Sequence, residues 1–505
     1  MLSTDYLLMA LFLVITGFLY THLFSYRRRH VKLPPGPKGW PVVGALPLIG
    51  DMPHQSLAVM AKQYGPLMHL RLGTTGMVVA STPAMARAFL KTLDADFSDR
   101  PYTVAARLTY DAQDMVFGQY GPRWKLMRKL TSLHILGAKA LEHGAAVRQE
   151  EVGVLVRAIR DAATVNVPEM LSCTMANIIS RLVLSRRMIE VEDEGPASRF
   201  KDLVNQAVAL SGQFNIGDFI PSIAWMNLQG IEGRLKRTHG KFDQIMDEMI
   251  ELHVKAAGER EGKPDFLDIL MADGGDSGHA LDSNNIKGLL LDLFIGGTDT
   301  SSNTIEWALA ELMSDPTMLG RAREELDRVI GHDRRLCESD LAKLPYLRAI
   351  CKEVLRKHPA MPLIPRVATK DSQVDGYDIP RGTRLIVNTW AIGRDPEAWE
   401  DPLKFMPERF LGDGKGAEIS YWGNDFELIP FGGGRRICAG MRLAAVVVEY
   451  ILGTLVHAFD WKLPEVGAAE GAQMMNMEES FGLTLRKAVP LTAIARPRLS
   501  PSAYV

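Results

Sequence analysis

Apolar residues that recur every three or four positions dominate the chain and predict a mainly helical protein. The expected helices cover residues 83–93, 121–131, 139–162, 168–184, 199–212, 228–257, 283–314, 317–330, 346–358 and 441–459. Shorter β-branched and alternating runs predict strands at 67–72, 76–80, 373–379, 384–388 and 481–485. The pattern therefore indicates a mainly α fold with small β-sheets (α+β), with a polar loop at 273–279 before the longest helix.

The first 26 residues follow a different pattern. No charged side chain occurs from Tyr6 to Tyr26, and these 21 residues, as a helix, would cross a hydrocarbon core of about 30 Å. Arg27, Arg28 and Arg29 follow directly, so the rest of the chain is expected on the cytosolic side. Because the charges follow the apolar run, the pattern favours an uncleaved anchor at 1–26 over a signal peptide.

A basic and proline-rich hinge is predicted at 27–41, because four prolines between 34 and 41 exclude a helix and favour an extended segment. The same prolines are compatible with a ligand for another domain. No second linker follows, so 42–505 is expected to form one domain.

Composition excludes several classes of protein. The chain has 58 Lys+Arg and 60 Asp+Glu, a net charge of −2, which gives no support for nucleic-acid binding over a broad surface. The four cysteines, Cys173, Cys337, Cys351 and Cys438, are far apart, which argues against a zinc ribbon or a dense disulfide framework. A chemically special cysteine would therefore act alone.

Cys438 is the cysteine with the strongest chemical context. It follows a glycine-rich turn and directly precedes the predicted helix at 441–459. The helix dipole and free backbone N–H groups at that end favour a thiolate, which is a good haem-iron ligand. Arg436 is spaced to meet a haem propionate. The alternative is a buried structural cysteine after a glycine turn.

Phe431, Gly434, Arg436, Cys438 and Gly440 match the pattern FxxGxRxCxG, and the chain thereby resembles the cytochrome P-450 monooxygenases over essentially its whole length. The resemblance implies the cytochrome P-450 fold, with haem b held by Cys438 as the axial ligand of its iron. It also implies O2 as co-substrate, NADPH electrons delivered by a separate reductase, and a single-pass location in the endoplasmic reticulum membrane. Arg435 is a candidate for docking that reductase.

A second motif lies inside the predicted helix 283–314. Gly296 and Gly297 are costly in a helix interior, by about 1 kcal/mol each relative to alanine, so we expect them to open space in a substrate pocket. The resemblance implies that Asp299 and Thr300 are the acid–alcohol pair that delivers protons during oxygen activation. The alternative is a packing glycine pair followed by polar residues.

Two further sets of residues take their roles from the resemblance. Glu353 and Arg356, three apart on one helix, would form a buried structural network with Arg409. Haem propionates would be bound by Trp124, Arg128, Arg366 and Arg436, although Trp124 taken alone is equally a core residue.

Several loop segments resemble plant flavonoid B-ring hydroxylases, and residues 478–491 resemble the 3′,5′-hydroxylase branch. The expected reaction is hydroxylation of a naringenin- or dihydrokaempferol-like flavonoid at 3′ and 5′ in flavonoid and anthocyanin biosynthesis. Thr484, a predicted pocket residue, is more similar to the 3′-hydroxylase branch. The alternatives are hydroxylation at 3′ only, another phenylpropanoid or terpenoid monooxygenase, or a haem sensor or electron carrier.

Overall fold

The computed structural model describes residues 31–189, 194–260, 262–272, 281–464 and 475–505, with isolated positions at 9, 12 and 15–17. The predicted anchor (1–26) falls almost entirely outside the described residues, as do residues 27–30 of the hinge and the predicted loop 273–279.

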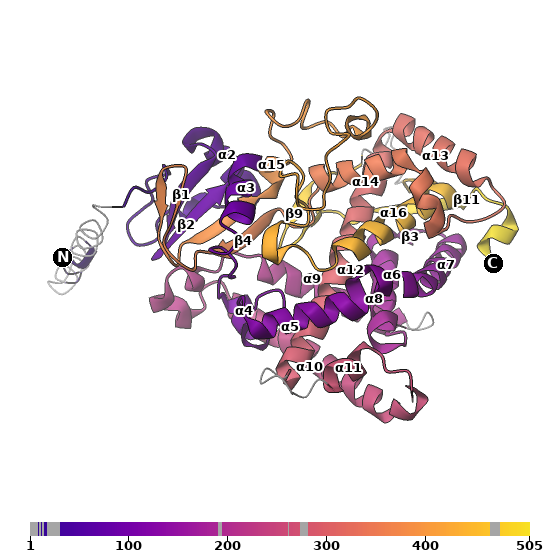
Figure 1. Ribbon diagram of the computed structural model, residues 1–505, viewed down its shortest axis with the longest axis horizontal. Helices are drawn as coiled ribbons and strands as arrows, with labels where there is room; N and C mark the ends of the chain where they lie inside the picture. The colour runs from indigo at the N-terminus through magenta and orange to yellow at the C-terminus, as the bar shows by residue number, and fades with distance from the viewer. Residues whose placement is uncertain are drawn as a thin grey trace, which may run out of the picture.

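Helices form most of the molecule, with the longest, α12 (Ser283–Ser314), at its centre (Figure 1). The others with regular α geometry are α2 (Pro53–Tyr64), α3 (Pro83–Arg87), α4 (Val104–Leu108), α5 (Pro122–Thr131), α6 (Ala138–His143), α7 (Ala145–Asp161), α8 (Val167–Leu184), α9 (Glu194–Ser211), α10 (Ile231–Lys255), α11 (Phe266–Ala272), α13 (Pro316–Ile330), α14 (Pro345–Lys357), α15 (Thr389–Ile392) and α16 (Met441–Ala458).

The main sheet lies at the end of the molecule nearer the N-terminus, with α2 and α15 beside it (Figure 1). Its strand order is β1 (Leu67–Leu72), β2 (Thr75–Ala80), β7 (Arg384–Asn388), β4 (Leu363–Val367), and only β2 and β7 run parallel. The smaller sheets are β3 (Val165–Asn166) with β11 (Thr492–Pro497) and β8 (Phe459–Lys462), the hairpin β5 (Ser372–Val374) and β6 (Tyr377–Ile379), and the hairpin β9 (Glu479–Phe481) and β10 (Leu485–Lys487).

The largest hydrophobic cluster surrounds α12, which packs against α8, α14 and α16. α12 begins as the pattern predicts, because Asp282 caps it by accepting a hydrogen bond from the backbone N–H of Asn285. Among the described residues, α16 is the one helix long and apolar enough to span a membrane, but 72% of it is buried inside the protein. It is therefore a core helix here.

The predicted mainly helical architecture with small sheets is confirmed, and the differences come from turns. The single strand predicted at 373–379 is a hairpin, because Asp375 (φ 52°) and Gly376 (φ 74°) form a tight two-residue turn. The strand predicted at 481–485 is the turn of a second hairpin, between β9 and β10. The helix predicted at 139–162 divides at Gly144 into α6 and α7.

Candidate functional site

Cys438 lies between the short helical turn η10 (Gly434–Arg436) and the first residue of α16. Burial raises the pKa of its thiol, while the backbone N–H groups of Gly440 and Met441 and the charge of Arg128 act in the opposite direction. The side chain is surrounded by protein atoms and yet accessible, so Sγ faces an interior space. A soft donor in this position suits a metal-centred cofactor bound inside the protein.

The glycine turn before Cys438 is shaped by contacts with protein. Gly434 has φ +67°, and a Cβ there would collide with the Leu90 carbonyl oxygen and the Asp94 carboxylate. The backbone N–H of Arg435 donates to the same Asp94 carboxylate over 3.0 Å. The close approach at Gly434 is therefore to the segment before Asp94, and the turn fixes where Cys438 stands. Phe431 supports it by accepting a hydrogen bond from the Cys438 N–H over 3.0 Å.

Four guanidinium groups gather near this turn, of which those of Arg366 and Arg436 are buried and those of Arg100 and Arg128 are half-buried. Arg100, Arg128, Arg366 and Arg436 form no ion pair with any carboxylate in the described part of the chain, and Nε and one terminal nitrogen of Arg366 are buried without a hydrogen-bond partner. Burial, followed by the neighbouring Arg436, lowers the pKa of Arg366 to about 9. Burial likewise lowers the pKa of Arg436 to about 10. Asp114 offsets part of the charge of Arg100 and Arg436 from beyond ion-pair distance. The positive charge that remains fits a cofactor that carries two carboxylates, as haem b does.

The predicted propionate ligands are not equally available. Arg366 keeps unpaired nitrogens, whereas Arg436 donates from Nε to the Ser98 carbonyl over 2.7 Å and from a terminal nitrogen to Gly118. The indole N–H of Trp124 donates to the Met115 carbonyl over 2.9 Å, and the Arg436 guanidinium lies 4.4 Å from the Trp124 ring centroid. Trp124 and Arg436 therefore organise the backbone around the site.

The adjacent glycines of α12 serve different purposes. A Cβ at Gly296 would meet nothing within 4 Å, so this residue borders open space. A Cβ at Gly297 would lie 2.7 Å from Cδ1 of Ile179, so this residue allows α8 to pack on α12. The pocket role predicted for Gly297 is therefore replaced by a packing role. The Thr300 hydroxyl donates to the Gly296 carbonyl over 2.8 Å on the same helix face.

Asp299 is buried and held by three side chains. It accepts hydrogen bonds from Thr484 (2.5 Å) and Asn303 (3.1 Å), and Arg486 lies 2.8 Å from its other oxygen. Burial raises the pKa of Asp299, while Arg486, Thr484 and Asn303 act to lower it. Thr484 is 4% exposed with its hydroxyl directed at Asp299, so it contacts the acid and does not line the cavity described below.

A cavity of about 970 Å³, including its mouth, lies between the main sheet, the end of α9 and the β9–β10 turn. Four phenylalanines line it, with a few polar groups such as Ser211 and Gln213; the phenylalanines are Phe117, Phe214, Phe219 and Phe481. The wall also includes Arg100 and Leu363, which connects the cavity to the guanidinium cluster. Neither Gly296 nor Gly297 lines it.

Two backbone contacts hold the roof of this cavity. Gly212, after α9, and Gly482, in the β9–β10 turn, touch so closely that a Cβ on Gly212 would overlap the Gly482 backbone. The Leu483 N–H donates to the Val208 carbonyl over 2.9 Å. At the other end of β9, Glu479 accepts hydrogen bonds from His54 (3.0 Å) and Trp390 (3.1 Å). The hairpin is therefore fixed at both ends.

Glu353, Arg356 and Arg409 come together behind the site and are all buried. Arg356 donates twice to Glu353, over 2.7 Å each, and Arg409 donates to Glu353 over 3.1 Å. Arg356 also donates to the Pro402 carbonyl over 2.8 Å. The three side chains thus fasten the segment before η9 (Pro407–Phe410) to α14, which is a structural arrangement.

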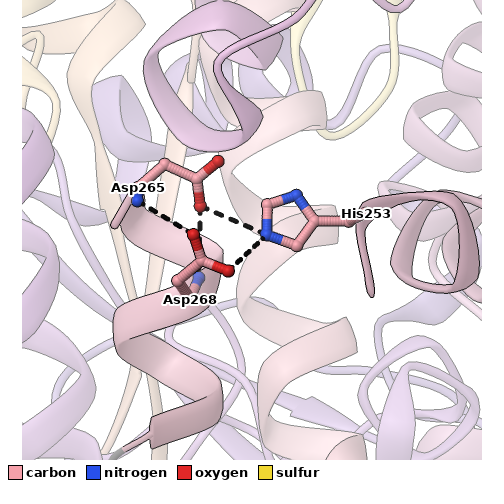
Figure 2. A group of neighbouring side chains, drawn as sticks. All are labelled: His253, Asp265 and Asp268. Atoms are coloured by element: carbon pink, nitrogen blue, oxygen red, sulfur yellow. Dashed lines mark hydrogen bonds and ion pairs between the residues drawn. The ribbon is translucent and has the colours of Figure 1, made fainter. Parts of the chain in front are cut away.

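A separate cluster joins α10 to α11 (Figure 2). Nε2 of His253 lies 2.9 Å from Oδ1 of Asp268 and 3.3 Å from Oδ1 of Asp265. Among the described side chains, these three lie close enough together to be candidate ligands of one metal ion. Arg260 donates to Asp268 over 2.9 Å and already supplies the positive charge that a metal would bring. We therefore assign the cluster to fastening α11 onto α10.

Three residues that the sequence predictions did not include lie at the guanidinium cluster near Cys438: Arg100, Asp114 and Asp292. Arg100 joins the guanidinium cluster. Asp114 and Asp292 are neighbouring acids beside it, and burial raises the pKa of both. The spacing of Asn285, Gly288, Asp292 and Gly296 on one face of a helix is the signal that points to Asp292.

Comparisons with known proteins agree with this geometry. Residues 34–486 match the sequence model of the family described as Cytochrome P450. The chain is 57% identical over 487 residues to a flavonoid 3′,5′-hydroxylase of Solanum melongena, covering 95% of this chain and 93% of that protein. It is 44% identical over 509 residues to a flavonoid 3′-monooxygenase of Arabidopsis thaliana, covering 99% and 98%.

Among solved structures, a zebrafish cytochrome P450 determined with progesterone superimposes with a TM-score of 0.73 at 28% identity, over 88% of this chain and 99% of that one. The family match includes both the central helix α12 and the cysteine turn. The chain belongs to the cytochrome P450 family.

Proposed function

We propose that this protein hydroxylates the B-ring of flavonoids at the 3′ and 5′ positions. The observation that carries the reaction class is the accessible Cys438 thiol at the amino end of α16, near Arg366, which is buried and keeps two unpaired nitrogens. The substrate class is supported by the higher identity to the 3′,5′-hydroxylase (57%) than to the 3′-monooxygenase (44%). A cavity walled by four phenylalanines suits a flat aromatic ligand.

The family uses haem b, O2 and electrons supplied by a reductase, and when haem is bound it supplies oxygen activation and insertion into a C–H bond. In this chain Cys438 would hold the iron, and Arg366, with its unpaired nitrogens, together with Arg100 would bind the propionates. The backbone N–H groups of Gly440 and Met441 stabilise negative charge on the sulfur.

The residues of α12 would manage protons at this site. The Thr300 hydroxyl is held by the Gly296 carbonyl and faces the open side of the helix. Asp299, on the next position, keeps a carboxyl in contact with Thr484 and Arg486. We infer that the Thr300 hydroxyl turns from the Gly296 carbonyl to give its proton to the site, and that Asp299 turns from Arg486, takes up a proton from solvent and returns it to Thr300.

Incubation of the full chain with a plant NADPH-dependent haemoprotein reductase, NADPH and naringenin tests the proposal by the mass gained per added oxygen. A flavanone that already carries the 3′-hydroxyl should gain a second oxygen. Replacement of Cys438 by Ala should abolish both turnover and the red-shifted carbon monoxide band of the reduced protein. A terpene that shifts the haem spectrum while naringenin does not would overturn the substrate class.

Hydroxylation at 3′ alone is the second candidate, because the chain is also 44% identical to a flavonoid 3′-monooxygenase over 99% of its length. Formation of the monohydroxylated product only, with that product left unchanged on further incubation, would select it.

We propose attachment to the cytosolic face of the endoplasmic reticulum membrane through residues 1–26, with electrons arriving from a membrane-bound reductase. Exposed apolar side chains support this, since Trp225 (81% exposed), Leu228 (59%) and Trp40 (50%) lie around the apolar cluster closest to the start of the described chain. Arg435, the expected docking residue, already pairs with Asp94 over 3.1 Å, so reductase docking would rely on other basic side chains. Vesicle flotation of the full chain against a Trp225→Ser variant tests the contact.

A further inference from the structure

The segment from Gln113 to Gly118 crosses α12 and supplies Val116 and Phe117 to the cavity wall. It has no regular secondary structure, so its backbone N–H groups need partners from elsewhere. How the segment is held therefore decides where these two side chains stand.

Asp292 of α12 supplies two of those partners. Its Oδ2 accepts the backbone N–H of Met115 over 2.7 Å and that of Val116 over 3.0 Å. Asp114 closes the other half of the segment by accepting the N–H groups of Phe117 (2.6 Å) and Gly118 (3.0 Å). All four successive N–H groups are thus bound by two carboxyls.

The same face of α12 makes two further contacts. Asn285 donates from its side-chain amide to the Gln113 carbonyl over 2.8 Å. A Cβ on Gly288 would lie 3.1 Å from the Cβ of Asp114, so glycine lets the segment approach. Asn285, Gly288 and Asp292 follow one another at three- and four-residue steps, which forms a continuous stripe leading to Gly296.

The segment is bound on its other side by residues around the cysteine turn. Trp124 donates to the Met115 carbonyl over 2.9 Å, and Arg436 donates to the carbonyls of Met115 (3.4 Å) and Gly118. Met115 is therefore hydrogen-bonded on both sides: its N–H donates to Asp292, and its carbonyl accepts from Trp124. A shift of Asp292 would be transmitted directly to Val116.

We propose that Asp292 is a positioning residue that sets the cavity wall formed by Val116 and Phe117, and thereby the ring position of the substrate that reaches the Cys438 site. The inference rests on the proposed function for its substrate. Asp292 does this as a hydrogen-bond acceptor for two N–H groups, which an amide oxygen can also provide.

Asp114 is buried and Asp292 is half-buried, which is consistent with this acceptor role. Burial raises the pKa of Asp114 to about 7, and it raises the pKa of Asp292, with a further contribution from the charge of Asp114. The nearby cations are Arg100 and Arg436, which interact with Asp114. A neutral acceptor at 292 is therefore compatible with the site, and Asp292→Asn is the conservative variant.

The test compares Asp292→Ala, Asp292→Ser and Asp292→Asn in the full chain. Asp315→Ala is the matched control, because Asp315 also accepts two backbone N–H groups, those of Thr317 and Met318, but at the start of α13. The measurements are naringenin affinity from the haem spectral shift, the ratio of mono- to dihydroxylated products, and amide exchange of residues 113–118.

We expect Asp292→Ala and Asp292→Ser to weaken naringenin binding roughly fivefold or more, to change the product ratio and to speed exchange at Met115 and Val116. Asp292→Asn and Asp315→Ala should stay within about twofold of the parent protein. Unchanged affinity and products in a variant with a normal carbon monoxide band would overturn the inference, as would an Asn variant as impaired as Ala. Absence of a naringenin response in the parent protein would instead count against the proposed function.

Discussion

Thr484 donates its hydroxyl hydrogen to Oδ2 of Asp299 over 2.5 Å, which links the turn of the β9–β10 hairpin to the middle of α12. The neighbouring residues of that turn, Gly482 and Leu483, line the cavity. The wall that faces the substrate therefore lies within two residues of Thr484, the hairpin residue that holds the acid expected to deliver protons.

Replacing Thr484 by Val removes this hydrogen bond at nearly constant volume. Because hydrogen bonds to a charged group contribute about 1.5–3 kcal/mol, we expect product formed per NADPH to fall at least severalfold while peroxide release rises. Thr484→Ser keeps the hydroxyl and should retain the parent coupling. Equal coupling in the Val and Ser variants would show that Asp299 does not depend on this donor.

Replacing Arg366 by Leu should have opposite effects with and without haem. The side chain is buried with two nitrogens unpaired, so its removal should stabilise the haem-free protein or leave it unchanged. Haem retention should weaken by roughly tenfold, because one charge-assisted contact to a propionate is lost. Haem transfer to an acceptor protein and thermal unfolding of both forms measure the two effects, and faster unfolding without faster haem loss would contradict the assignment.

Alanine at the two α12 glycines should separate their roles. Gly297→Ala places a methyl group 2.7 Å from Ile179 and should destabilise the fold by about 1–3 kcal/mol. Gly296→Ala enters open space and should stabilise α12 by up to about 1 kcal/mol. Denaturant unfolding compares the two, with Ile179→Val as the partner change that should partly rescue Gly297→Ala. Equal changes in unfolding free energy for the two alanine variants would show that the two glycines do not have separate roles.

Glu479 should make stability depend on pH below 5. Burial alone would raise its pKa, but His54, Arg394 and Trp390 together lower it from 4.5 to about 2. Since the folded carboxyl has the lower pKa, its contribution is complete above about pH 5 and is lost as the pH falls from about 4.5 toward 2.

Glu479→Gln should therefore cost roughly 3 kcal/mol at pH 7 and progressively less below pH 4.5, as measured by urea unfolding. Glu397→Gln replaces an exposed glutamate and is the control. The difference in unfolding free energy between this variant and the parent protein should not change with pH. A difference in unfolding free energy between variant and parent that stays constant from pH 7 to pH 4 would contradict an ion-pair origin of the stabilisation.

The helical architecture and the cysteine site were accessible from sequence because each rests on local chemistry. The apolar periodicity predicted Ser283–Ser314 at its observed bounds, and Cys438 was identified by the glycines and helix beside it. Turn geometry was harder, since the positive φ angles of Asp375 and Gly376 break an otherwise uniform strand pattern.

Contacts between distant segments could not be predicted from one sequence. The pairing of Thr484 with Asp299 spans 185 positions, and that of Asp292 with Met115 spans 177. The two glycines of α12 look equivalent in sequence, and only the proximity of Ile179 on α8 distinguishes them.

The contact between Gly212 and Gly482 has a consequence for how this protein can diversify. Because a Cβ on Gly212 would overlap the Gly482 backbone, and one on Gly482 would press on Val208 and Ala209 at 3.2 Å, α9 and the β9–β10 turn are packed backbone against backbone. New preferences among substrates should then arise by exchanging the neighbouring side chains, such as Phe214, Phe481 and Leu483, on an unchanged backbone. Related proteins would then be expected to keep both glycines while the residues beside them vary.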